Sequence, residues 1–113
     1  GQLENGAAVR IAGLDAGEVT DIRIPDSPSQ KFRVRMEVRR DMRQLVRTDS
    51  EATTQTEGLV GAIYVNIGAG TEAAPIVDDA RTGAYDGLWT ALKGVAGVPF
   101  VPDPLDFAPN YLT

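Results

Sequence analysis

The sequence contains neither cysteine nor histidine. Without cysteine, the chain can form no disulfide bond and no thiolate metal site. Without histidine, it lacks the usual general base near neutral pH and the commonest metal ligand. Nucleophilic catalysis by a Ser–His or Cys–His pair is therefore excluded. We predict a protein that is not an enzyme and that uses no metal and no cofactor.

Other catalytic or ligand-binding patterns are also scarce. Asp78 and Asp79 are the only adjacent acidic pair, and we interpret them as a solvated turn rather than as the two carboxylates of a hydrolase. Residues 68–71 have the composition of a phosphate-binding loop, but no lysine follows and no helical pattern begins there. We therefore read them as a turn as well. No spacing of acidic residues matches a calcium-binding loop.

Basic residues are outnumbered by acidic ones, 11 to 16, so the net charge is −5. A negative net charge disfavours nonspecific binding to nucleic acid. The charge is uneven, however. Residues 31–47 hold seven basic and two acidic residues, a net charge of +5, whereas the rest holds four basic and fourteen acidic residues, a net charge of −10. The basic segment is either a surface that contacts phosphate groups or simply the solvated face of an amphipathic strand. We favour the second interpretation and predict no nucleic-acid partner.

Long hydrophobic runs are missing too. The longest uncharged run, residues 58–71, contains several glycines and is shorter than the roughly 20 apolar residues of a membrane-spanning helix. The first residue is Gly1 rather than methionine. We therefore expect the sequence to begin inside a longer chain, which leaves room for an N-terminal signal or anchor.

The first 80 residues have the pattern of short strands. Apolar and charged residues alternate strictly over residues 32–39, and a second alternation covers residues 62–67. Residues 9–11 and 19–24 read as a hairpin whose five-residue loop, 13–17, has glycine at both ends. A β-bulge near Thr20 and Asp21 would restore its inward face. Residues 41–46 fit a helical turn or an irregular link, and residues 50–56 a strand with little burial on either face.

The chain end differs from the rest. Asp86 can cap a short helix that would place Leu88, Trp89, Leu92 and Val95 on one side. Four prolines after residue 98 should prevent a regular helix or a central strand, so we expect this tail to lie along a neighbour or to be poorly ordered. We accordingly divide the chain into an all-β barrel or sandwich over residues 1–82 and an extension over residues 83–113, with its short helix and Pro-rich tail.

Two stretches resemble the MCE (mammalian cell entry) family, in particular its MlaD-like members. Residues 9–22, VRIAGLDAGEVTDI, resemble the opening hairpin of the family. Residues 49–52, 56–61 and 64–67, DSEA, TEGLVG and YVNI, resemble its polar strand, its glycine-flanked apolar loop and its closing strand. The resemblance covers about residues 6–79. Val46, Arg47 and Thr48 replace the proline that often precedes the polar strand.

The resemblance implies a single small seven-stranded β-barrel that forms a homohexameric ring with a hydrophobic pore. It further implies a phospholipid-transport ring, the substrate-binding component of an ABC transporter, which works with a permease and an ATPase. The expected location is the periplasm, anchored to the bacterial inner membrane by an N-terminal helix, or alternatively the chloroplast inner envelope. By position in the family pattern, Leu59 and Val60 would line the pore, and Gly58 and Gly61 would shape its loop.

The residues themselves leave two alternatives open. Two adjacent apolar side chains at a loop tip suit a ring in which copies shield one another, but they could also pack into the core of their own domain. A small β-barrel that serves as a protein-interaction module without lipid transport is the alternative function.

Overall fold

The computed structural model describes residues 3–24, 26–27, 32–79, 88–89 and 105–112. Its strands are β1 (Ala8–Ile11), β2 (Leu14–Arg23), β3 (Phe32–Arg39), β4 (Ala52–Thr56), β5 (Ile63–Ile67), β6 (Leu88–Trp89) and β7 (Leu105–Leu112). One 3-10 helix, η1 (Arg40–Leu45), follows β3 and fulfils the expectation of a helical turn there. The predicted all-β class is confirmed.

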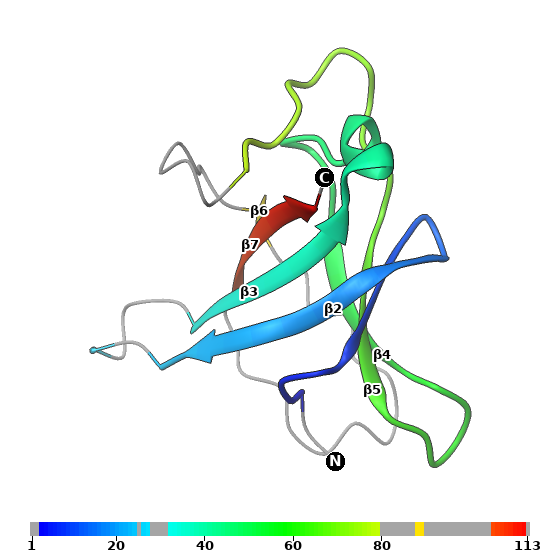
Figure 1. Ribbon diagram of the computed structural model, residues 1–113, viewed down its shortest axis with the longest axis vertical. Helices are drawn as coiled ribbons and strands as arrows, with labels where there is room; N and C mark the ends of the chain where they lie inside the picture. The colour runs from blue at the N-terminus through cyan, green and yellow to red at the C-terminus, as the bar shows by residue number, and fades with distance from the viewer. Residues whose placement is uncertain (1–2, 25, 28–31, 80–87, 90–104, 113) are drawn as a thin grey trace.

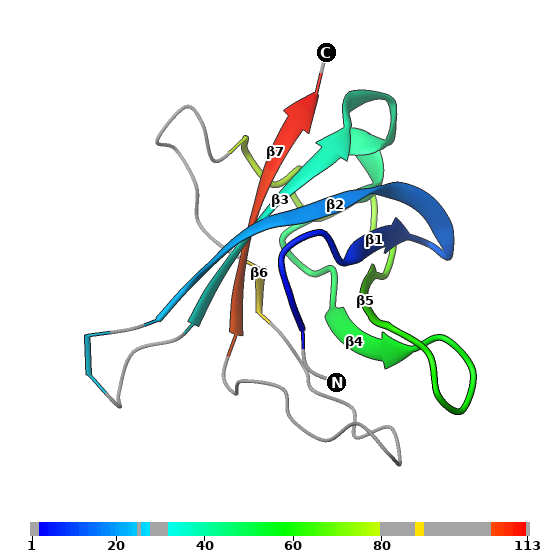
Figure 2. The ribbon, with the colours of Figure 1, turned by 60° about the horizontal axis from the view of Figure 1, so that its bottom comes forward.

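The strands form a single sheet in the order β4-β5-β1-β2-β3-β7-β6. Within the described residues, β4 pairs only with β5 and β6 pairs only with β7. No ladder therefore joins the two edges, and the predicted closed barrel is not found in this part of the chain. The sheet nevertheless curls, so that β4 and β5 run in a different direction from β2 and β3 (Figures 1 and 2).

One apolar core lies on the inner face of this curled sheet. Val34, Met36 and Val38 are fully buried, as the alternation in β3 predicts, and so are Val65 and Ile67 on β5. The strand predicted between residues 50 and 56 also exists as β4, but its expected lack of burial is wrong. Ala52, Thr53 and Thr54 are all buried, so both faces of the first half of β4 are covered, and Ala52 belongs to the core.

The first hairpin is confirmed, with a shorter loop than the glycine pattern suggested. Ala12 and Gly13 both have positive φ, 51° and 82°, and they form a two-residue turn between Ile11 and Leu14. Gly17 is therefore inside β2, where an added Cβ would lie 1.7 Å from the carbonyl oxygen of Glu37. The register of β2 against β3 shifts between Val19 and Asp21, which confirms the predicted bulge.

The end of the chain departs most from expectation. Leu88–Trp89 form strand β6, not a helix, because they pair with β7; the rest of the predicted helix lies outside the described residues. β7 pairs in parallel with β3 along its whole length, between β3 and β6, despite Pro109. The N–H of Tyr111 points away from β3, since it donates to Asp79 Oδ2 at 2.9 Å. Pro109 shares that orientation, so its missing N–H removes no bond to β3.

Candidate functional site

Of the large apolar side chains in the described part of the chain, the most exposed belong to the loop that joins β4 to β5. Leu59 is 100% exposed and Val60 97% exposed. The loop extends away from the sheet as a narrow projection at the lower right of Figure 1. The possibility that these two side chains pack into their own domain is therefore not realised.

Two glycines allow the loop to turn so sharply. Gly58 has φ +67°, a conformation that side chains disfavour. Gly61 comes so close to the start of the loop that an added Cβ would lie 1.7 Å from the Glu57 carbonyl oxygen. The Glu57 N–H donates to the carbonyl of Ala62 at 3.0 Å and closes the base of the loop. Both glycines thus lie in this loop, and their role in shaping a pore stays a prediction.

A polar cluster lies at the root of the loop. Arg10 on β1 donates from Nη2 to Glu57 Oε2 at 2.7 Å, and its guanidinium carbon lies 4.1 Å from the centroid of the Tyr64 ring. Asp15 Oδ1 lies 3.4 Å from Arg10 Nε. The Tyr64 hydroxyl in turn donates to Gln55 Oε1 at 2.7 Å. Desolvation is the largest single influence and lowers the pKa of Arg10, but the hydrogen bond and charge of Glu57, together with Tyr64 and Asp15, raise this pKa by more, so that it lies above its usual value.

Sequence reasoning missed this cluster. The only signal is that Gln55, on the strand before the apolar loop, and Glu57, just after that strand, are two residues apart, and that Tyr64 lies on the strand after the loop. Their arginine partner stands 47 residues away from Glu57, and only the parallel pairing of β1 with β5 brings it there.

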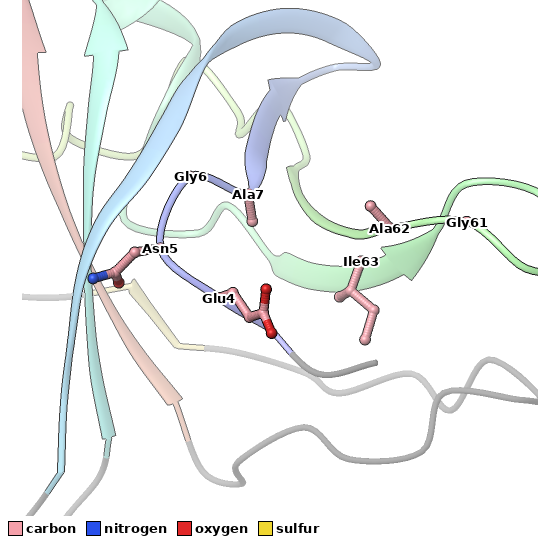
Figure 3. Close-up of a pocket in the computed structure, with 7 residues that line it drawn as sticks. All are labelled: Glu4, Asn5, Gly6, Ala7, Gly61, Ala62 and Ile63. Carbon is pink, nitrogen blue, oxygen red and sulfur yellow. The ribbon is translucent and has the colours of Figure 1, made fainter.

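A small cavity lies beside the loop. Segment 4–7, which precedes β1, forms one wall, and residues 61–63, where the loop enters β5, form the other (Figure 3). Its volume is about 290 Å³. Among the residues that the structure describes, two other large apolar side chains are exposed, Leu14 beside the first turn and Ile24 after β2.

The basic segment is largely occupied within the domain. Arg39 pairs with Asp41 at 2.6 Å, and Arg40 Nη2 lies 3.7 Å from Asp79 Oδ2. Arg47 donates to the carbonyls of Gln44 and Ala74, at 2.7 and 3.0 Å. These contacts weigh against a phosphate-binding surface. The expected solvated strand face is found in part, since Arg39 is exposed but Arg33 and Arg35 are only partly exposed.

Two further segments, residues 78–79 and residues 68–71, were predicted to be turns. Asp78 and Asp79 were interpreted as a solvated turn; Asp78 is exposed as expected, but neither residue is in an assigned turn and Asp79 is buried. That carboxylate is only 7% exposed, because it accepts the Tyr111 N–H and lies near Arg40. Residues 68–71 contain no strand or helix, and Asp49 accepts the N–H and the hydroxyl of Thr71. Among the described residues, no cluster of acidic side chains could hold a metal ion.

The described part of the chain is thus an all-β sheet that exposes two adjacent apolar side chains at the tip of one loop. A model of the MlaD protein family matches residues 1–70. The chain belongs to this family, which is one of lipid-transport components of the MCE class rather than of enzymes. No curated protein matches the chain significantly. Within the described residues, no helix is long and apolar enough to cross a membrane.

Proposed function

We propose that this chain is a subunit of a homohexameric ring that transports phospholipid or a related lipid. Leu59 and Val60 line its central pore, and Gly58 and Gly61 give the pore loop its shape. The observation that carries the proposal is the nearly complete exposure of two adjacent apolar side chains at the tip of a constrained loop. In a monomer these side chains remain in water. Copies arranged around an axis would shield one another and form an apolar collar.

The mechanism we propose is passive. An acyl chain that enters an apolar collar retains about 0.8 kcal/mol of hydrophobic free energy per buried CH₂ group, so the passage lowers the barrier to leaving a membrane. The direction and the energy would come from the permease and ATPase of an ABC transporter. Membership of the MlaD family supports a periplasmic position, with an N-terminal helix in the bacterial inner membrane; the chloroplast inner envelope is the alternative.

Native mass spectrometry of the purified chain tests this proposal. We expect a hexamer that carries phospholipid through purification. A lipid-free monomer, combined with a failure of Leu59 to crosslink to a photoactivatable phospholipid in vesicles, would contradict it. That result would favour a protein-interaction module, for which exposed Leu14 and Ile24 offer further apolar contacts.

A further inference from the structure

The side chain of Arg10, on β1, holds the base of the apolar loop between β4 and β5. Glu57 is the first residue after β4, and its carboxylate accepts a hydrogen bond from Arg10 on β1 at 2.7 Å. β1 lies in the sheet directly beside β5. The ion pair therefore ties the departing end of the loop to the strand next to its returning end.

Arg10 is itself held in place. Its guanidinium lies over the Tyr64 ring at 4.1 Å, and Asp15 is 3.4 Å from its Nε. A planar guanidinium that stacks on an aromatic ring presents its donors in a fixed direction. The Arg10 side chain is accordingly 27% exposed, whereas that of Arg39, in its own ion pair with Asp41, is 59% exposed.

The glycines of the loop give its backbone conformational freedom, and the Arg10–Glu57 ion pair restricts that freedom. Gly58 has no atom within 4 Å of where its Cβ would be, so nothing packs against the loop there. Glycines at both ends give a segment the conformational range to swing as a unit. Against this freedom stand the Glu57–Ala62 backbone bond at 3.0 Å and the Arg10–Glu57 ion pair. Of the two, only the ion pair reaches outside the hairpin formed by β4 and β5.

We propose that Arg10 is a positioning residue that fixes the angle at which the loop leaves the sheet. On the proposed function, on which this consequence rests, the angle sets the width of the apolar passage and thereby which lipids fit it. The pair is partly exposed and therefore open to screening, since the Debye length falls from about 8 Å at 0.15 M salt to about 3 Å at 1 M. High salt should release the loop.

A spin label on the loop tests this. The chain has no native cysteine, so Val60→Cys gives a single nitroxide site at the loop tip. In that background, Arg10→Gln should abolish the immobile component of the electron paramagnetic resonance spectrum of the label. Glu57→Gln should have the same effect, and the double variant should be no more mobile than either single variant. Arg10→Lys, which keeps the charge without the planar fork, should fall between. Arg39→Gln, which breaks the comparable pair with Asp41, should change nothing.

A label placed by Ile24→Cys, just after the end of β2, distinguishes a local effect on the loop from a general loosening of the domain. Arg10→Gln should leave that spectrum unchanged, and 1 M salt should mobilise the loop label in the unmodified background but not in Arg10→Gln. The proposal is overturned if Arg10→Gln and Glu57→Gln both fold and leave the Val60→Cys spectrum as it was, or if both labels loosen equally. If Arg10→Gln does not fold, Glu57→Gln decides alone. A mobilised loop without lipid crosslinking at Leu59 would refute the transport role and leave the positioning role intact.

Discussion

The variant Leu59→Asp should leave the stability of the domain unchanged and weaken its proposed binding of lipid. The Leu59 side chain is 100% exposed, so the domain buries none of it on folding. Aspartate is also well tolerated in turns. The free energy of unfolding should therefore change by no more than about 0.5 kcal/mol, and the thermal unfolding curve should nearly overlay that of the unmodified chain.

Lipid binding should respond very differently. A leucine that passes from water into contact with acyl chains gains about 1.5–3 kcal/mol. Aspartate loses this gain and adds the cost of taking a carboxylate out of water. Since each 1.4 kcal/mol is about tenfold in affinity, we expect at least a tenfold loss for each loop that contacts lipid.

The assay is the amount of phospholipid that co-purifies per chain, together with restoration of outer-membrane lipid balance in a bacterial strain that lacks its own homologue. Leu14→Asp is the matched control, because Leu14 is also an exposed apolar residue, 64% exposed, but lies beside the first turn of the sheet. It should retain lipid. If Leu59→Asp carries as much lipid as the unmodified chain and still restores the lipid balance, the reasoning about the pore loop is refuted.

Two further predictions concern stability. Gly61→Ala should lower the free energy of unfolding by about 1–3 kcal/mol, since the added Cβ would overlap the Glu57 carbonyl. Gly68→Ala is the control and should be almost neutral in the same denaturant titration, because the nearest neighbouring atom to its added Cβ is 3.7 Å away. Burial raises the pKa of Tyr111 to about 12. The folded chain then keeps this proton longer than the unfolded chain, so the stabilisation is complete below about pH 10 and up to about 3 kcal/mol of it is lost as the pH rises towards 12. Denaturant titrations across that range should show the loss in the unmodified chain and not in Tyr111→Phe, and an equal loss in both would contradict it.

Local pattern was enough to predict the inner strands. Strict alternation identifies β3 because one face of that strand is buried and the other is not. The bulge near Asp21 follows from the same rule, since it restores the phase of the apolar residues. Gly58 and Gly61 mark a turn for reasons that lie within a few residues of themselves.

What could not be predicted depends on residues far apart in the chain. The hairpin turn falls at Ala12 and Gly13 because Gly17 is required elsewhere, by close approach to the backbone of Glu37 on β3. Ala52 to Thr54 on β4 are buried by parts of the chain that their own polar sequence does not reveal. Likewise, nothing near Arg10 in the sequence indicates that it meets Glu57.

The pairing of β7 with β3 has a consequence for how the chain acquires its shape. Residue 105 pairs with residue 32, so about seventy residues must be synthesised before β3 gains this neighbour. Until then β3, whose inner face is wholly apolar at residues 34, 36 and 38, is a bare edge that can recruit a strand from another chain. Closing so long a loop is also slow. Strand β7 therefore covers this edge of β3, although it lies beyond residues 1–70, which the family model matches.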